Sequence, residues 1–486
     1  MDPTPKRFRE VISDLNNAAL ESISDIDYCI IGAGPAGITL ALDLENTGKK
    51  ILLLEAGSIY WTHESADCYK GINTGDQYFE LQHSRQRFFG GTSNHWTGWC
   101  RTLDESDFLS SDISGSSWPI QKKDLDPFLK QSCEILEVQS NYTNRMLSKK
   151  FGIEAQSFEF SPPVRFGQKY KDRIETSNSI HLIINANLTD LAYNDVKVNK
   201  VIVSSYSRHQ LEIKAQTFIL ATGGIENSRL LLWLNKKNKL NIVNKISPLG
   251  KYWMEHPHFY IGKAFLDRRW KNTYLGLNAA ARKDLGILNA GIRIEGLGDE
   301  GSTALIKDIM CVAPDLGKKI GNLFEKNLVC AANIRGAWEQ APNINSSIEI
   351  SEDSFDSFGI PRAILNWKKT NFDITTIKKT LQQINAWILY KNLGRLKYDD
   401  WIIRGSTFPE SLETGGHHHM GGTRMGLEIA DSVVDKNLRV HQKENFYILG
   451  SSVFPTGGHA NPTLTILQLT LRLSSYLQKI DNNVLT

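Results

Sequence analysis

Two turn-rich segments near the C-terminus carry side chains that could act together on a hydroxyl group. The first, residues 417–426, reads HHHMGGTRMG, and the second, residues 454–465, reads FPTGGHANPTLT. A neutral imidazole can take the proton of an alcohol, and the carboxamide of Asn461 can donate to or accept from the same oxygen without a change of charge. The two segments therefore predict a histidine–asparagine pair that handles an alcohol.

Three consecutive histidines could instead indicate a metal site. In an extended segment, however, alternate side chains point to opposite faces, so His417, His418 and His419 cannot all converge on one ion. The six cysteines are scattered and form no CxxC or CxxCH motif, which leaves zinc, c-type haem and iron–sulfur sites without support. We therefore expect no metal, and we interpret His417 and His418 as structural or substrate-lining residues, with His459 as a further candidate for the pocket.

The N-terminal region has the pattern of a nucleotide-binding strand–turn–helix–strand unit. An apolar run at 28–31 predicts a buried parallel strand, residues 32–37 read GAGPAG, and a helical pattern follows up to Gly48. A second apolar run at 51–54 ends at Glu55, 18 residues beyond the last glycine of the motif. In this context the glycine motif predicts a dinucleotide site; the alternative is a tight turn with an unrelated acid.

The residues of this unit have separate expected roles. Gly32 allows the tight turn, Gly34 lets the backbone approach a pyrophosphate, and Gly37 lets the helix pack closely on the strand. The pyrophosphate would lie at the helix N-terminus, and Glu55 is placed to accept hydrogen bonds from both ribose hydroxyls. These residues do not distinguish FAD from NAD.

Two further glycine-rich segments extend the predicted binding region. Residues 87–99, RFFGGTSNHWTGW, combine hydroxyls and aromatics with paired glycines, which permit close backbone approach and an anion-binding nest of amides. The alternative for this segment is a surface loop with buried tryptophans. Residues 217–232 are typical of a strand, a glycine turn and a helix, and this second unit would return the chain to the nucleotide sheet.

The pattern changes between about Pro248 and Arg404. Alternating runs at 347–350 and 363–367 predict antiparallel strands, and a helix is expected from 373 to 393. Tryptophans in this block could cover a substrate, although we interpret most of them as core residues: Trp338, Trp367, Trp387 and Trp401.

Composition argues against several classes of function. The net charge of +3 arises from interspersed acids and bases, whereas nucleic-acid binding needs a clustered basic face. The apolar fraction of 41% is enough for a sizeable core. No run reaches the roughly 18 apolar residues of a membrane helix, and the N-terminus lacks the apolar segment of a signal peptide, so a cytoplasmic protein without a membrane span is expected.

Taken in order, these motifs resemble those of the glucose–methanol–choline (GMC) oxidoreductases, a family of FAD-dependent alcohol oxidases and dehydrogenases. The similarity runs nearly end to end, in the stretches Gly32 to Glu55, Gly90 to Trp96, 118–120, Ala221 to Arg229, 255–258, 356–361 and the C-terminal pair. It implies an α/β fold with α+β insertions. A Rossmann-like FAD-binding domain, assembled from discontinuous segments, would lie beside a substrate-binding domain with an antiparallel sheet and helices.

The resemblance also implies domain boundaries and a set of cofactor contacts. Residues 1–250 would form the main part of the FAD-binding domain, with its cofactor loop and excursions. Residues 251–404 would form the substrate-binding domain, and residues 405–486 would return to the FAD-binding domain with the catalytic pair. FAD is favoured over NAD. The expected cofactor contacts are Gly32, Gly34, Pro35, Ala36, Gly37, Glu55, Ala56, Arg87, Gly90, Gly91, Thr92, Asn94, His95, Trp96, Leu188, Ala221, Gly450, Ser451, Asn461, Pro462 and Thr463.

The catalytic residues follow from the same resemblance. In the family, a His-x-x-Gly-Thr segment supplies the catalytic histidine, which falls on His419 here. A second position, histidine or asparagine in different members, falls on Asn461. The implied reaction is the oxidation of an alcohol, in which the imidazole takes the hydroxyl proton while the α-hydride passes to flavin N5.

Three details concern how the flavin would be held, two of them by comparison with pyranose oxidase. In pyranose oxidase and choline oxidase, the histidine of a Gly-Gly-x-Ser-x-His pattern is covalently bonded to the flavin, and this histidine falls on His95 here. Relatives with a similar histidine hold FAD non-covalently, so covalent attachment through His95 is open. Gly450 stands where many members have aspartate, which puts a side-chain contact to the cofactor in doubt there, although pyranose oxidase shares the glycine. The helix opening near Pro462 and Thr463 is expected to aim amides at the flavin N1–C2 carbonyl.

Similarity to pyranose oxidase makes a sugar, glycoside or cyclitol the leading small-molecule substrate. The alternatives are a simple non-sugar alcohol, or a non-redox lyase of the same family with structural FAD. The chain has no haem or cluster motif, so electrons would pass to oxygen, a mediator or a separate protein. Oligomeric state is not indicated by any motif.

Overall fold

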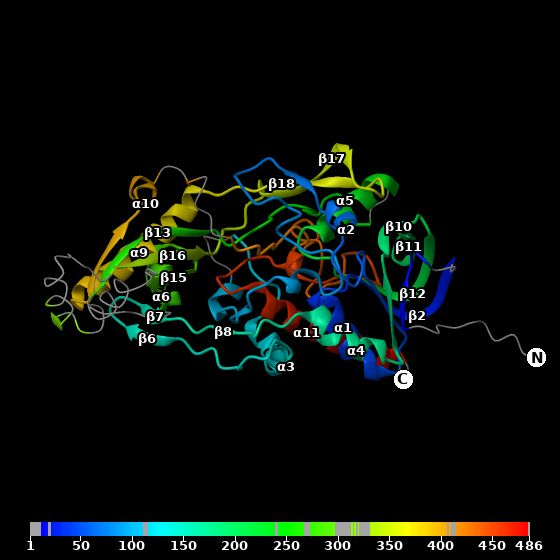
Figure 1. Ribbon diagram of the computed structural model, residues 1–486, viewed down its shortest axis with the longest axis horizontal. Coiled ribbons are helices and arrows are strands. Elements are labelled where there is room, and N and C mark those ends of the chain that lie inside the picture. The colour runs from blue at the N-terminus through cyan, green and yellow to red at the C-terminus, as the bar shows by residue number, and fades with distance from the viewer. Residues whose placement is uncertain are drawn as a thin grey trace, which may run out of the picture.

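The chain forms two bodies joined in an elongated molecule (Figure 1). One body is built on a mainly parallel sheet and contains both the N-terminal segments and the C-terminal helix, and the other is built on an antiparallel sheet. The computed structural model describes residues 11–17, 21–109, 115–238, 242–266, 273–296, 313, 315–316, 319, 331–405, 408–409 and 415–484.

The first body is organised around an eight-stranded sheet in the order β1-β9-β3-β2-β12-β11-β10, with β20 also paired to β12. The strands from β1 to β12 in this order run parallel, and β20 pairs parallel to β12. Strand β11 pairs antiparallel to β12, and β10 pairs antiparallel to β11. All residues of β3 are buried, because elements cover both faces of the sheet. The strands are β1 (Ile12–Asp14), β2 (Ser22–Ile31), β3 (Ile51–Leu54), β9 (Ile180–Ile184), β10 (Asn187–Tyr193), β11 (Val198–Ser204), β12 (Gln210–Leu220) and β20 (Phe446–Ile448).

The expected strand–turn–helix–strand unit is formed by β2, α1 (Pro35–Leu44) and β3. Pro35 lies in the first turn of α1, where a missing N–H costs no helical hydrogen bond. Gly32 adopts a left-handed φ of 112°, and a Cβ on Gly37 would lie 1.9 Å from the carbonyl oxygen of Gly32. The start of α1 therefore packs directly on the end of β2, and a side chain at position 37 would displace it, whereas a Cβ on Gly32 would lie 2.4 Å from the carbonyl oxygen of Ala221.

The second body contains a seven-stranded antiparallel sheet in the order β19-β13-β16-β15-β14-β7-β6. Helix α9 (Asn371–Tyr390) packs on it through buried side chains such as Ile377 and Leu381, which confirms the helix expected at 373–393. The strands are β6 (Arg145–Ser148), β7 (Ile153–Ala155), β13 (His258–Leu266), β14 (Thr273–Leu277), β15 (Ala290–Gly296), β16 (Ala331–Trp338) and β19 (Gly394–Tyr398).

Two features of this body bear on the sequence predictions. Trp338, Trp367 and Trp387 are buried, and Trp401 packs against the same cluster as Trp338, so the core interpretation of most tryptophans is confirmed. Strands β6 and β7 come from the part of the chain assigned to the FAD-binding domain, so they are an excursion into the second sheet. The domain boundaries otherwise stay a prediction.

A small sheet, visible above the first body in Figure 1, joins distant parts of the chain. The runs expected to be antiparallel strands form β17 (Ser347–Phe355) and β18 (Pro361–Asn366), which pair with each other, and β4 (Gly71–Asn73) pairs parallel to β18. The other elements are α2 (His63–Asp67), α3 (Leu129–Leu136), α4 (Phe166–Glu175), α5 (Glu226–Asn238), α6 (Ala279–Leu285), α10 (Asp400–Arg404), α11 (Pro462–Val484), β5 (Trp99–Cys100) and β8 (Glu159–Phe160).

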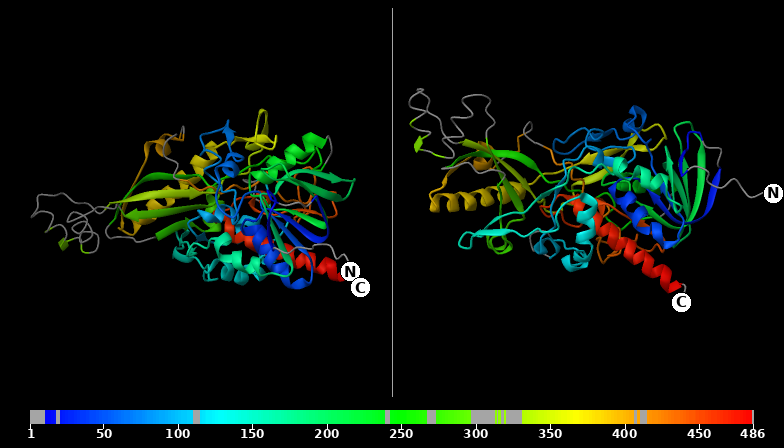
Figure 2. Two further views of the ribbon diagram at one scale, coloured as in Figure 1. Left: turned by 45° about the vertical axis from the view of Figure 1, so that its right-hand side comes forward. Right: turned by 60° about the horizontal axis from the view of Figure 1, so that its bottom comes forward.

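The C-terminal helix α11 lies beside α1 along one side of the first body (Figure 2). Because β20 joins β12 and α11 then packs on α1, the segment between them is held next to the N-terminal glycine turn. The described helices include none that is both long and apolar enough to cross a membrane.

Candidate active site

A cavity of about 470 Å³ opens at the carboxyl ends of β2, β3 and β12, where the N-terminal, middle and C-terminal parts of the chain meet. This is the edge of an open α/β sheet where ligands bind. Of the expected cofactor contacts, those that line the cavity are Gly32, Gly34, Pro35, Ala36, Glu55, Ala56, Arg87, Gly91, Thr92, His95, Trp96, Leu188, Ala221, Gly450, Ser451, Asn461, Pro462 and Thr463.

Three expected contacts support the wall and do not line it. Gly37 packs on Gly32, the amide of Gly90 donates to the carbonyl oxygen of Ala33 at 2.9 Å, and the side chain of Asn94 donates to the carbonyl oxygen of Phe89 at 3.0 Å. The bond from Gly90 holds the second glycine loop against the first, and the bond from Asn94 lies within the second loop. Their role is to shape the cavity.

The two glycine loops touch each other at the cavity wall. A Cβ on Gly91 would lie 3.1 Å from the Cα of Gly34, and Gly91 has a left-handed φ of 55°. Side chains at this point would therefore fill the space that the backbone amides face. The observed close approach is what the cradle of a dinucleotide pyrophosphate requires.

Glu55 lies at one end of the cavity with both carboxylate oxygens held by backbone amides. Oε2 accepts from the amide of Ala33 at 3.0 Å and Oε1 accepts from that of Gly57 at 2.9 Å. Burial raises the pKa of this carboxyl, while the amides and the nearby Arg87 oppose that shift. Each oxygen keeps a further lone pair, so the geometry is compatible with the predicted acceptance of hydroxyl donors.

Two buried arginines on the wall carry hydrogen-bond donors that no described residue satisfies. Arg87 donates to Tyr206 at 2.8 Å and Arg85 lies over the ring of Tyr69 at 3.9 Å, but the Nε–H of each arginine has no acceptor among the described residues. A buried unpaired donor is costly, so these groups fit an anionic ligand in the cavity. Arg85 was not among the expected contacts. It lies three residues before Phe88, and no sequence pattern distinguished it from Arg87 as a cavity residue.

The histidine that meets Asn461 is His418. Its Nε2 lies 3.0 Å from Nδ2 of Asn461, whereas Nε2 of His419 lies 3.0 Å from the hydroxyl of Tyr78. The structure therefore does not bring His419 into contact with Asn461, and its assignment as the base stays a prediction. The reason is the alternation of side chains in the extended segment, which turns adjacent histidines to opposite sides.

A buried carboxylate, Glu255, fixes this arrangement. It accepts from the backbone amide of His418 at 2.8 and 2.9 Å, from the amide of His256 at 2.8 Å, and from the hydroxyl of Tyr78 at 2.7 Å. His256 therefore also lies in this network. Neither Glu255 nor Tyr78 was singled out by the sequence, since nothing local to Tyr78 indicates that it reaches residues far along the chain.

The histidines at this end are held neutral. Burial, followed by the neighbouring His256, lowers the pKa of His418 well below its ordinary value, and burial followed by Arg85 does the same for His419. Burial also lowers the pKa of His417, to about 4. A neutral imidazole next to a carboxamide can accept a proton from a bound hydroxyl group.

Part of the C-terminal half of the chain matches a known family. Residues 342–470, which contain both histidine- and asparagine-bearing segments, match the family model described as GMC oxidoreductase. Over this stretch the chain is similar to GMC oxidoreductases.

Two GMC relatives illustrate the range of similarity. The large subunit of fructose dehydrogenase from Gluconobacter japonicus is 24% identical over 57% of this chain and 50% of its own length. The 2-methyl-1,2-propanediol dehydrogenase of Mycolicibacterium austroafricanum is 26% identical over 56% of this chain and 49% of its own length. The chain thus matches about half the length of these curated relatives.

The fold is shared with solved structures at low sequence identity. Pyridoxine 4-oxidase from Mesorbium loti superposes with a TM-score of 0.58 at 14% identity, over 93% of this chain and 99% of that one. The mixed α/β arrangement of this chain is therefore that of a known architecture.

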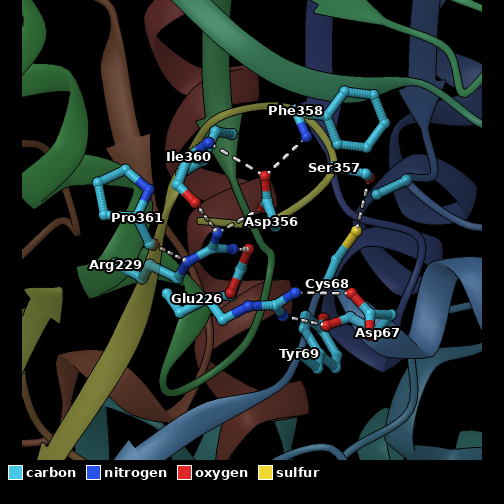
Figure 3. Close-up of polar contacts among 12 residues, drawn as sticks. Asp67, Cys68, Tyr69, Glu226, Arg229, Asp356, Ser357, Phe358, Ile360 and Pro361 are labelled. Atoms are coloured by element: carbon cyan, nitrogen blue, oxygen red, sulfur yellow. Dashed lines mark hydrogen bonds and ion pairs between the residues drawn. The ribbon is translucent and has the colours of Figure 1, made fainter. Parts of the chain in front are cut away.

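Behind the cavity wall, the protein contains a buried chain of charges (Figure 3). Arg229 binds Glu226 at 2.8 Å and Asp356 at 2.5 Å, and Glu226 in turn lies 3.3 Å from Arg85. Burial raises the pKa of Glu226, but Arg229 and Arg85 outweigh it and the net shift is downward. The chain links α5 and the loop after β17 to an arginine of the cavity wall.

Proposed function

We propose that the protein is an FAD-dependent oxidoreductase that converts the hydroxyl group of a small alcohol or sugar into a carbonyl. The observation that carries the proposal is the contact of 3.0 Å between His418 and Asn461 in the cavity lined by both glycine loops. A neutral base and a carboxamide donor thus face the same space as the predicted dinucleotide cradle.

The residues of the cavity fit FAD. The paired glycine loops, the N-terminus of α1 and the unsatisfied donors of Arg85 and Arg87 suit a pyrophosphate, and Glu55 suits a ribose. Pro462 and Thr463 open α11, whose first amides would face the flavin ring. When bound, the flavin would supply an acceptor for a hydride.

The chain's own groups would handle the alcohol as a pair. A hydroxyl that displaced their mutual contact would donate to Nε2 of His418 and accept from Nδ2 of Asn461. Proton transfer to His418 then leaves negative charge on the alcohol oxygen, which the Asn461 amide stabilises. We therefore place the base at His418 in preference to His419.

A sugar, glycoside or cyclitol is proposed as the substrate class. It is supported by the motif resemblance to pyranose oxidase and by the one relative named fructose dehydrogenase, whereas the diol dehydrogenase among the relatives supports the alternative of a simple alcohol. Oxygen, a mediator or a separate protein would take the electrons.

Anaerobic mixing with a panel of sugars and alcohols should bleach the absorbance of the oxidised flavin for at least one of them. Admission of air afterwards distinguishes an oxidase, whose colour returns, from a dehydrogenase, whose colour returns only with a mediator. A protein that dithionite bleaches but no alcohol does would contradict the proposal and favour a non-redox role of FAD.

Covalent attachment through His95 is tested by acid precipitation. His95 lines the cavity, and burial, followed by Arg165, lowers the pKa of its imidazole, so a neutral nitrogen faces the site. Attachment predicts yellow colour in the pellet of the wild type and in the supernatant of His95→Ala. Colour wholly in the wild-type supernatant would show that FAD is held non-covalently.

A further inference from the structure

A second buried histidine lies directly behind His418. Nδ1 of His256 is 2.9 Å from Nδ1 of His418, and Nε2 of His256 is 3.4 Å from the carbonyl oxygen of Gly457. The two rings are nearly perpendicular, at 79°, and His256 is 1% exposed. His256 thus contacts both segments that carry the proposed catalytic pair.

The carbonyl of Gly457 sets the direction of the hydrogen bonds through this chain. A carbonyl oxygen only accepts, so Nε2 of His256 must carry a proton, and Nδ1 of a neutral His256 must then be an acceptor. Nδ1 of His418 is therefore the donor in the contact between the two rings, and Nε2 of His418 has the lone pair. That lone pair accepts from the Asn461 carboxamide, whose Nδ2 can only donate.

The opposite direction is not self-consistent. If Asn461 offered its oxygen to His418, Nε2 of His418 would carry the proton and each bond behind it would reverse. Nε2 of His256 would then have to accept from a carbonyl, which has no proton to give. Only one tautomer of His418 therefore satisfies every hydrogen bond in the series from Gly457 through His256 to Asn461.

We propose that His256 is a positioning residue that holds His418 in the tautomer with an unprotonated Nε2, which can take a proton from a hydroxyl that displaces the Asn461 contact, and that ties this base to the loop of Asn461. The inference rests on the proposed function, since it assigns a role to His256 in the same proton transfer. After Nε2 of His418 gains the substrate proton, its Nδ1–H still donates to His256. The carboxylate of Glu255, with Oε1 3.9 Å from Nδ1 of His418, faces the positive charge that develops.

Other ionisable groups surround the pair and leave the assignment intact. His258 lies with its ring 5.7 Å from that of His418, and burial followed by Arg335 lowers its pKa to about 3, so it adds no charge near neutral pH. Burial likewise lowers the pKa of His256 to about 4. The imidazoles of His256 and His418 are thus both neutral near neutral pH. Each ring therefore carries one N–H, and the position of that proton decides which nitrogen donates.

Three substitutions at one position separate a directing role from space filling. His256→Leu keeps an apolar volume and removes both hydrogen bonds. His256→Asn can place a carboxamide oxygen near the former Nδ1 and so restore an acceptor for His418, whereas His256→Gln can restore the donor to Gly457. All three are compared with the wild type in flavin content and in thermal unfolding, so that only folded, loaded protein is assayed.

The proposal expects His256→Leu to slow anaerobic flavin reduction about 10- to 100-fold, with little change in the substrate concentration needed for half-saturation, and His256→Asn to recover most of the rate. Equal rates in Leu and Asn variants would overturn it, as would a wild-type rate in His256→Leu. Histidine-selective ¹⁵N labelling gives a second readout that does not depend on turnover: Nδ1 of His418 should be protonated and Nε2 not. The reverse tautomer would overturn the inference, and a wild type that no alcohol reduces would instead defeat the proposed function.

Discussion

Replacing His418 by alanine should slow the reduction of the flavin by an alcohol about 10²- to 10⁴-fold, the usual contribution of a well-placed acid–base group. His418 is the histidine whose Nε2 meets Asn461 in the cavity, so its loss removes the acceptor for the hydroxyl proton. The measurement is rapid anaerobic mixing with a saturating alcohol, followed by flavin absorbance. Reduction of the same variant by dithionite at the wild-type rate would show that the flavin itself is intact.

His419→Ala is the matched control, because it removes the same kind of side chain from the adjacent position. Its Nε2 contacts the hydroxyl of Tyr78 and not Asn461, so the loss of rate should be much smaller than for His418→Ala. If the larger loss appeared in His419→Ala, the assignment of the base to His418 would fail. The sequence-based assignment to His419 would then be correct.

The nucleotide end of the molecule could be predicted because its signals are local. The strand, the glycine turn, the helix and Glu55 follow one another within the chain. At positions 32 and 37 a side chain would clash with neighbouring backbone, and the sequence shows this directly because both residues are glycine. The structure places the turn and the acid at one cavity, as expected. Periodicity also sufficed for α9 and for the antiparallel partners β17 and β18.

The identity of the base was harder to predict, because the doubled glycine admits two alignments. His419 satisfies the spacing His-x-x-Gly-Thr through Gly422, but His418 satisfies His-x-x-Gly through Gly421. Which imidazole faces Asn461 depends on how the segment is turned, and Glu255, far away in sequence, fixes this by binding the amide of His418. Such long-range contacts leave no periodic trace in the sequence.

Arg229→Met should lower the free energy of unfolding by about 3–5 kcal/mol, the range expected when one partner is removed from a buried ion pair. Arg229 is 1% exposed and bridges the carboxylates of Glu226 and Asp356, which would be left without their shared cation. Its Nε also donates to the carbonyl oxygen of Pro361 at 2.7 Å, so a buried acceptor loses its partner too. Urea unfolding with an unchanged dependence on denaturant would measure the loss.

Arg173→Met provides the same substitution at an exposed ion pair. Arg173 binds Glu45 at 2.8 Å with half of its side chain exposed, so its loss should cost about 1 kcal/mol or less. Equal losses in the two variants would show that burial of the Arg229 ion pairs adds nothing to their contribution to stability.

Because Glu226 also pairs with Arg85 on the cavity wall, the loss of Arg229 should also weaken FAD binding. Arg229→Met should retain less FAD through gel filtration, whereas Arg173→Met should retain the wild-type amount. A fall in stability without a fall in FAD content would confine the charge chain to a structural role.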